Sequence, residues 1–469
     1  MARLSRILFG IALTGIALSL LATLVWVVAS FGRPLDGVEG DVLFEAQRIR
    51  RGLPLYVDPT IGAREYGEPP ARYLVLYPPL WSAFLAIAPN VVFGRIVATI
   101  AWLGVLGFVA FRAPKRTPVA IFAAFIAGTW VLAFYGSAAR PDALAIACAG
   151  IALERAVRLG RADAISGVLF ALAAWTKPNV IGAAPGALLA SLIVSRPRTI
   201  VPALLGLLGT SAVIAGVLSL MTGRAWLDHL LASTAQPPSL ALWTEQLRDR
   251  LPFFALPLGG AFYLGWKRKS DPSVRIATFA LATSLGWALL SLAKIGSASN
   301  YFMEPCVAAL VLLGYVDVPR HPALAAVLCV QIAWNGTAAI KSSVSGITLS
   351  SERAEVLANL RQTCGASAKD VILADEPGLE LSLNGRIVAT PFQTTHRIRS
   401  GHFPAALWIA DIERAEARCF VAQNDILERP LDDVIVEHDR FGPELRKALA
   451  ARFEHVTTRA GFFIYRARR

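Results

Sequence analysis

Charged residues are scarce in this sequence. Only 17% of its 469 residues are Asp, Glu, Lys or Arg, whereas 55% are hydrophobic, and the mean hydropathy is +0.53. In a soluble globular chain about a quarter of the residues are charged, so water is not the main solvent of this one. Apolar runs of about 20 residues, the length that crosses a bilayer, recur through the first three quarters of the sequence.

A convincing signal-peptide cleavage site is also lacking. The first apolar run, residues 7–30, follows Arg3 and Arg6. It is too long for the hydrophobic part of a signal peptide, and no A-x-A motif of the expected kind ends it. We therefore predict a retained first helix with its N-terminus in the cytoplasm.

The formal charge of +13 does not indicate a nucleic-acid partner, because the basic residues are not gathered on one helix or stripe. They stand in short clusters between apolar runs, as the positive-inside rule expects of cytoplasmic loops. The clusters are Arg112, Lys115 and Arg116; Arg155, Arg158 and Arg161; Arg196 and Arg198; Lys267, Arg268 and Lys269; and Arg320. Their alternation predicts about eleven transmembrane helices, the last at about residues 322–340, with the C-terminal part outside.

The predicted fold is a polytopic α-helical membrane domain, residues 1–345, followed by a soluble α/β domain, residues 346–469. In the second domain, charged patterns predict helices near residues 351–361 and 443–451. Apolar runs predict strands at DVILAD (370–375), RIVAT (386–390), ALWIAD (406–411), DVIVEHD (433–439) and FFIYRA (462–467). Cys364 and Cys419 lie in this domain, and whether they form a disulfide is left open because their distance is unknown.

Polar side chains gather on the outer face. The first outer loop, residues 31–76, contains the segment DVLFEAQRIRRG, which is predicted to be an amphipathic helix on the membrane surface. At the outer ends of the predicted helices lie Glu39, Asp41, Arg140, Asp142, Lys177, Lys294 and Glu304. Charges at a membrane boundary invite a functional explanation. Such a group suits a phosphate and a divalent cation, with one carboxylate left to accept a proton.

Ordinary structural roles compete with this interpretation at each position. Asp41 is a good candidate for a helix N-cap. Arg140 and Asp142 flank Pro141, which suits the first turn of a helix, and Lys177 can extend toward lipid headgroups. From the residues alone, both kinds of explanation stay open.

Several motifs in order along the chain resemble one family. The segment GVEGDVLFEAQRIRRGLPLYVDP with the following YLVLYPPLW, then ARPDALAIACAGIAL, LAAWTKPN and the tail segment DVILADEPGLELSLNGRIV resemble the GT-C superfamily of membrane glycosyltransferases. This superfamily uses polyprenyl-phosphate sugars and includes protein O-mannosyltransferases and bacterial aminoarabinose transferases. The chain departs from many relatives in having Glu39 and Asp41 separated by Gly40, and Asn300-Tyr301 where they often carry His-Tyr.

The resemblance implies a transferase that moves a sugar from a polyprenyl-phosphate donor to an acceptor hydroxyl on the outer face of a bacterial-type cytoplasmic membrane. Asp41 is then the expected base and Glu39 the second choice, because the acceptor must lose a proton. The expected ligands of the lipid phosphate or sugar are Arg140, Asp142, Lys177, Lys294, Asn300, Tyr301, Glu304 and Tyr77. No cofactor is demanded; Mg²⁺ or Mn²⁺ would accept Asp41 and Asp142 as ligands. The expected partners are the donor, membrane lipids and an acceptor lipid, glycan or protein, without nucleic acid.

A multi-span transporter or lipid flippase is the main alternative, because many helices with a few charges also describe a substrate pathway. A structural or assembly factor is a third, but it leaves the acidic outer loop without a purpose. The position of the charges at one surface, rather than at the membrane midplane, favours the transferase.

Overall fold

The computed structural model describes residues 2–194, 197–234, 238–296, 298–318, 322–427 and 440–468. Its N-terminal helices are α1 (Ala2–Ala29), α2 (Gly37–Arg50), α3 (Leu80–Leu85), α4 (Val91–Arg112), α5 (Arg116–Gly128), α6 (Trp130–Ser137), α7 (Asp142–Leu159), α8 (Ala164–Thr176), α9 (Ala183–Val194) and α10 (Val201–Thr222). Next come α11 (Ala225–Thr234), α12 (Leu240–Lys267), α13 (Pro272–Ser291), α14 (Met303–Leu313) and α15 (Pro322–Cys364). The tail contains β1 (Ile372–Ala374), α16 (Pro377–Asn384), α17 (Pro391–Arg399), α18 (Ala405–Arg414), β2 (Cys419–Ala422), α19 (Pro443–Arg452), β3 (Phe453–Arg459) and β4 (Phe462–Ala467).

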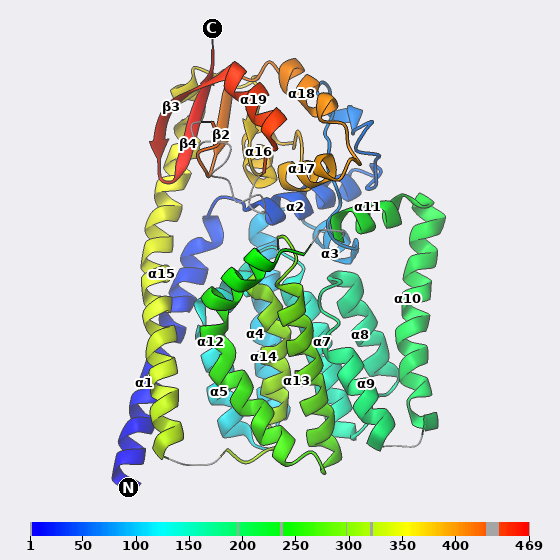
Figure 1. The fold of residues 1–469 in the computed structure, drawn as a ribbon, viewed down its shortest axis with the longest axis vertical. Helices are drawn as coiled ribbons and strands as arrows, with labels where there is room; N and C mark the ends of the chain where they lie inside the picture. Colours follow the sequence, from blue (N-terminus) through cyan, green and yellow to red (C-terminus); the bar gives the residue numbers. More distant parts are fainter. Residues whose placement is uncertain are drawn as a thin grey trace.

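Most of these helices form one bundle with the tail domain at one end (Figure 1). Among the described residues, four helical stretches are long and apolar enough to cross a membrane: residues 7–32, α4, α10 and α13. A fifth is added if α5 and α6, which meet at a bend of 77°, form one span. The predicted fold class, a helical membrane protein with a small C-terminal sheet, is therefore confirmed, whereas the number of eleven spans remains a prediction.

Local sequence signals explain where several bundle helices begin and how they pack. Asp271 caps α13 by accepting hydrogen bonds from the backbone N–H groups of Ser273 (2.8 Å) and Val274 (3.2 Å), as an N-cap aspartate should. Helices α8 and α10 cross closely because Gly167 and Gly206 carry no side chain. A Cβ at Gly206 would lie 2.3 Å from the backbone oxygen of Ala164, so this small residue is required for packing.

The described basic clusters lie at the end of the bundle opposite the tail domain (Figure 1). There Lys115 and Arg268 both form ion pairs with Asp317, and Arg155 pairs with Asp163. Arg196 and Arg320 lie outside the described residues. The described basic clusters thus lie at one end of the bundle and the folded tail at the other. The positive-inside rule would place the first end in the cytoplasm, and this orientation stays a prediction.

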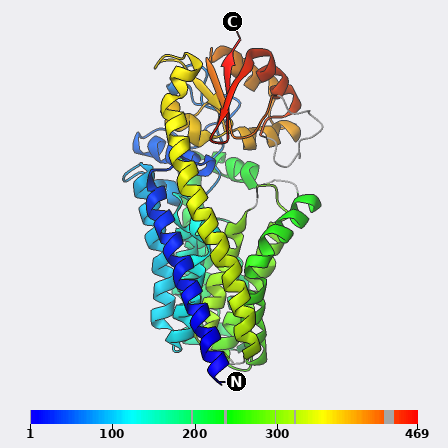
Figure 2. The same ribbon diagram turned by 90° about the vertical axis from the view of Figure 1, so that its left-hand side faces the viewer.

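The tail domain is built on a four-stranded sheet in the order β1-β2-β4-β3. β1 and β2 are parallel, and β4 is antiparallel to both of its neighbours. Helix α15 runs from the bundle beside α1 into the tail (Figure 2), and its end packs on the sheet through Leu360 and Cys364. Cys364 forms a disulfide with Cys419 of β2, which answers the question that the sequence left open. The predicted domain boundary after residue 345 falls inside this continuous helix.

Two strand predictions in the tail are wrong. Residues 406–411 belong to helix α18, in which Trp408, Asp411 and Ile412 are buried, as is the C-cap residue Ala415; this spacing of three, four and seven is that of a helix face. Residues 386–390 form only an isolated bridge, Arg72 with Ala389, because they pair with the first outer loop rather than with the sheet. The predicted strand 433–439 lies outside the described residues. The strands at 370–375 and 462–467 and both predicted helices are confirmed.

The first outer loop is fixed to the tail domain. The Arg72 backbone N–H donates to Val388 (2.8 Å), and its carbonyl accepts from the Thr390 N–H (3.0 Å). Its guanidinium is buried in an ion pair with Asp411 of α18. Helix α2 lies between the bundle and the tail (Figure 1), with most of its residues buried; its predicted place on the membrane surface stays a prediction.

Candidate functional site

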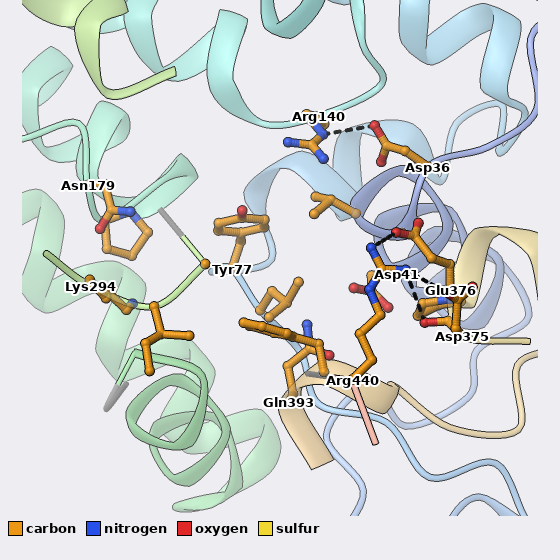
Figure 3. A pocket seen from close by; sticks show the side chains of 18 of the residues that line it. Asp36, Asp41, Tyr77, Arg140, Asn179, Lys294, Asp375, Glu376, Gln393 and Arg440 are labelled. Carbon is orange, nitrogen blue, oxygen red and sulfur yellow. Dashed lines mark hydrogen bonds and ion pairs between the residues drawn. The ribbon is translucent and has the colours of Figure 1, made fainter. Parts of the chain in front are cut away.

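A cavity of about 310 Å³ lies where the first outer loop, the loops of the bundle and the tail domain meet. We call it the interdomain cavity. Its polar lining comes from α2 and the loop before it (Asp36, Asp41), from the loops that connect helices at this end of the bundle (Tyr77, Arg140, Asn179, Lys294, Tyr301) and from the tail (Asp375, Glu376, Gln393, Arg440). Figure 3 shows Asn179, Tyr77 and Lys294 on one side of it and Asp41, Asp375, Glu376 and Arg440 on the other.

Helix α2 is set in place by a capping box. The Asp36 side chain accepts a hydrogen bond from the Glu39 N–H (2.7 Å), and the Glu39 carboxylate accepts one from the Asp36 N–H (3.3 Å). Without these bonds the backbone N–H groups of Asp36 and Glu39 would have no partner at the start of the helix. Asp36, and not Asp41, is therefore the N-cap, so the structural explanation offered for Asp41 from the sequence does not apply.

Glu39 is fully engaged in holding α2 to the bundle. Its carboxylate accepts hydrogen bonds from the Arg95 guanidinium (2.9 and 2.5 Å) and from the Ala139 N–H (2.8 Å), and Arg33 lies 3.4 Å away. Although burial opposes ionisation, the hydrogen bond and charge of Arg95 and the charge of Arg33 hold the pKa of Glu39 below its usual range. Glu39 does not line the cavity. These contacts disfavour Glu39 as the base.

The carboxylate of Asp41, in contrast to that of Glu39, faces the cavity and lacks ion-pair partners among the described residues. It lines the cavity, and its Oδ1 is buried without a hydrogen-bond partner among the described residues. Burial raises its pKa well above the usual range, as do the carboxylates of Glu45, Glu376 and Asp36, while Arg140 opposes them. A buried polar atom without a partner is unusual and calls for an explanation. A carboxylate oxygen that faces a cavity and has no partner is available to accept a proton from a bound molecule.

Two cations face the same cavity. The Arg140 Nε donates to Asp36 at 3.2 Å, and the guanidinium lies over the Tyr135 ring at 5.2 Å, so one of its three nitrogens is used and its orientation is fixed. Lys294 lies in the loop before the short 3-10 helix Ser299–Phe302, and its ammonium group has no ion pair within the described ranges. Burial, followed by the charge of Lys177, lowers the pKa of Lys294. Both side chains can bind an anion in the cavity.

Other predicted ligands form a supporting layer beside the cavity. The Asp142 Oδ1 contacts Lys177 and accepts from the Asn300 amide (2.7 Å). The ammonium of Lys177 lies 5.5 Å from the centre of the Tyr77 ring, and Tyr77 lines the cavity. The structure therefore brings Asp142, Lys177 and Asn300 together, but they do not line the cavity themselves, and their role as ligands stays a prediction.

The remaining predicted ligands divide between the cavity and the bundle. Tyr301 lines the cavity, and its hydroxyl accepts a hydrogen bond from the Asn179 amide (2.7 Å). The Glu304 carboxylate accepts from the N–H groups of Gly182 (3.0 Å) and Ala183 (2.9 Å). Glu304 therefore caps the start of α9 and does not line the cavity.

For the proposed metal ligands, the structure places Asp41 on the cavity but not Asp142, whose Oδ1 contacts Lys177 while its Oδ2 is buried without a hydrogen-bond partner among the described residues. In the part of the chain that the structure describes, no three His, Cys, Asp or Glu side chains are grouped to hold a metal ion. The Mg²⁺ or Mn²⁺ expectation stays a prediction.

The tail supplies cavity residues that the sequence did not predict. Asp375 and Glu376 follow β1, and both pair with Arg440. Oδ1 of Asp375 and Oε2 of Glu376 are buried without hydrogen-bond partners among the described residues. Burial raises the pKa of Asp375, and the charge of Glu376 adds to the effect while Arg440 opposes it. The signal in the sequence was an acidic pair directly after an apolar strand-like run, in DVILADE.

Two glycines bring Asp41 and this acidic pair together. A Cβ at Gly40 of α2 would lie 2.3 Å from the Cα and N of Gly378 in α16, and a Cβ at Gly378 would lie 2.2 Å from the backbone oxygen of Asp36. Only residues without a side chain allow α2 and α16 to approach this closely. The glycine between Glu39 and Asp41 is thus a close contact point between the first outer loop and the tail.

Comparisons with known proteins bear on the fold. A scan against protein-family models and a search of curated proteins give no match. Among solved structures, the chain is similar to ArnT from Cupriavidus metallidurans in the apo state, with a TM-score of 0.58 and 11% identity over 96% of this chain and 97% of that one. It is also similar to the same protein bound to undecaprenyl phosphate, with a TM-score of 0.56 and the same identity and coverage. The likeness covers nearly the whole of both chains, so this chain shares the overall fold of ArnT.

Proposed function

We propose that the protein is a glycosyltransferase that moves a sugar from a polyprenyl-phosphate donor to an acceptor hydroxyl, with Asp41 as the catalytic base. The observation that carries the proposal is the interdomain cavity, in which the buried, unpartnered carboxylate of Asp41 lies with Arg140 and Lys294. The fold shared with a protein whose structure contains undecaprenyl phosphate supports the class of donor.

The chemistry requires two groups that the cavity supplies. As the acceptor oxygen bonds to the anomeric carbon, its proton passes to Asp41, and the bond from that carbon to the phosphate oxygen breaks. A carboxylate with a raised pKa is a stronger base once it is ionised. The leaving phosphate carries the negative charge that develops, and Arg140 and Lys294 stabilise it. Asp142 and Lys177 act as positioning residues through Tyr77.

The cavity accounts for a reaction at one face of the membrane. It lies at the end of the bundle that carries the tail, opposite the basic turns around Lys115 and Arg268. By the positive-inside rule that end faces away from the cytoplasm. A transporter or lipid flippase, the alternative from another class, would be expected to bind its substrate near the midplane, whereas this cavity is lined by loops and by the tail.

Asp41→Asn tests the base. With purified full-length protein and undecaprenyl-phosphate sugars as donors, kcat of transfer to acceptors in a membrane extract is expected to fall by about 10²- to 10⁴-fold, the usual contribution of general base catalysis. Binding of undecaprenyl phosphate and the unfolding temperature should change little, because the amide has nearly the same shape. A variant that transfers sugar at the wild-type rate would remove Asp41 as the base.

Glu39→Gln is the matched comparison, two residues away on the same helix. Removing one partner of a buried ion pair destabilises a protein by about 3–5 kcal/mol, and Glu39 pairs with Arg95 and Arg33. This variant is expected to lose thermal stability, with activity falling as folded protein is lost. If Glu39→Gln kept the wild-type unfolding temperature and lost only kcat, the roles of the two carboxylates would be reversed.

A further inference from the structure

A second pocket, of about 880 Å³, lies beside the interdomain cavity. We call it the arginine-histidine pocket, because its basic lining consists of Arg224, His229, His396, Arg397, Arg399 and His402. These residues come from α11, the loop before it, α17 and the loop after it, so the pocket lies between the bundle and the tail. Its volume falls within the range of small-molecule sites.

The two cavities are neighbours. Ile295 lines both of them, and helix α17 borders both, with Phe392 and Gln393 on the interdomain cavity and His396 one turn later on the second pocket. The Phe392 and His396 rings are in edge contact, with centroids 4.6 Å apart. A molecule held in the arginine-histidine pocket therefore lies next to the cavity that contains Asp41.

The charges in the second pocket favour an anion. Asp58 and Asp228 are its acidic residues. Asp58 accepts hydrogen bonds from the Thr60 N–H (2.8 Å) and hydroxyl (2.7 Å), and Asp228 pairs with Arg224 at 3.2 Å. Neither carboxylate forms an ion pair with Arg397, although both lie near enough to stabilise its charge.

Arg397 is the residue best placed to bind that anion. Its only hydrogen bond in the described structure runs from Nη2 to the backbone oxygen of His402 at 3.3 Å, and its Nε is enclosed without a partner. Guanidinium groups bind phosphate through two parallel N–H donors. His229 is not such a ligand, because its Nδ1 accepts from the Val75 N–H (3.1 Å) and its Nε2 lies 3.0 Å from the Val57 oxygen. It holds the first outer loop against α11 instead.

We infer that the arginine-histidine pocket binds a phosphate-type oxyanion on the acceptor through Arg397, so that the acceptor hydroxyl reaches Asp41 past Ile295 and Phe392. The pocket's volume exceeds that of the interdomain cavity, as an acceptor larger than a sugar phosphate requires. An acceptor role rests on the proposed transfer reaction, whereas anion binding in this pocket can be measured without it.

The test compares two probes on the full-length protein in phosphatidylcholine nanodiscs. Inorganic pyrophosphate reports on the arginine-histidine pocket and undecaprenyl phosphate on the interdomain cavity, each titrated by calorimetry. Arg397→Gln is expected to lower the affinity for pyrophosphate about tenfold to a hundredfold, as the loss of a charge-assisted hydrogen bond would. The affinity for undecaprenyl phosphate is expected to fall at least tenfold less. The control Arg459→Gln removes the same charge from the exposed face of β3 and should change neither affinity.

The outcomes separate the two proposals. Pyrophosphate binding that is insensitive to Arg397→Gln, or that is lost only in Lys294→Ala, would overturn the second site. If undecaprenyl phosphate did not bind while Arg397→Gln still lowered the affinity for pyrophosphate, the proposed class of donor would be wrong and the proposed anion site would be supported. Nanodiscs that contain phosphatidic acid identify the source of the phosphate: competition with pyrophosphate indicates a lipid headgroup, and no competition indicates a soluble or glycan-borne group.

Discussion

Replacing Gly40 with alanine should impair transfer without touching any charged group. A Cβ at this position would lie 2.3 Å from backbone atoms of Gly378 and 2.8 Å from the carbonyl carbon of Pro377. Carbon atoms in contact are normally about 3.5–4.0 Å apart, so α2 and α16 must separate by about 1 Å or more. Backbone atoms cannot move aside as a flexible side chain can.

The separation is expected to change the cavity rather than unfold the chain. Glu39 holds the other face of α2 to Arg95, so the tail, with Asp375 and Glu376, is the part that moves away. Overpacking of this kind costs about 1–3 kcal/mol, whereas a displacement of about 1 Å at a catalytic site costs about 10²-fold in rate. We therefore expect kcat to fall by about 10²-fold and the unfolding temperature to fall modestly.

The measurement is sugar transfer from undecaprenyl-phosphate sugars, together with thermal unfolding, in Gly40→Ala and two companion variants. Gly378→Ala approaches the same contact from the other side, where its Cβ would meet the Asp36 oxygen at 2.2 Å, and should behave alike. Gly104→Ala in α4 is the control, since nothing lies within 4 Å of its Cβ. Wild-type kcat in Gly40→Ala, or an equal loss in Gly104→Ala, would refute the reasoning.

Two further predictions concern pH and the disulfide. Because Asp41 acts as a base only when ionised, kcat should rise with pH through its raised pKa; Glu376→Gln removes a neighbouring negative charge, so the acidic limb of the kcat–pH profile should move to lower pH. An unmoved or upward-shifted limb contradicts this. Cys364→Ala combined with Cys419→Ala should destabilise the tail by about 4 kcal/mol, because the bond closes a loop of 55 residues. Denaturant unfolding with and without reductant measures the change, and a wild-type midpoint in the double variant would contradict it.

Much of the fold follows from the sequence because hydropathy and charge act over long windows. These patterns alone were enough to predict the apolar helices, the basic turns and the strands β1 and β4. Helix α18 shows why a short stretch of sequence is misleading. Residues 406–411 are mostly apolar, and the buried positions Trp408, Asp411, Ile412 and Ala415 are recognisable as a helix face only over the eight residues 408–415. The strand prediction for residues 386–390 was wrong for another reason. This segment pairs with Arg72, which is more than 300 residues away in the sequence.

About half of the polar residues that line the interdomain cavity could be identified from the sequence. Asp41, Tyr77, Arg140, Lys294 and Tyr301 line the cavity as expected, because polar residues at the ends of neighbouring membrane helices converge on one surface. The tail's contribution was not predictable, because it depends on how two domains dock. Nothing local to Asp375, Glu376 or Arg440 indicates that they face Asp41. That placement depends on contacts between distant segments, among them Gly40 with Gly378 and Arg72 with Asp411.

The sequence contains a signal that helps to decide whether Glu39 or Asp41 is the better candidate for the base. Asp36 followed three residues later by Glu39 is the pattern of a capping box, and it fixes the start of α2 at Gly37. From that start, residues two apart on a helix point to nearly opposite sides. Glu39 and Asp41 therefore cannot both face the cavity. Glu39 is used in the capping box and, separately, in its ion pair with Arg95, which is why we propose Asp41 rather than Glu39 as the base.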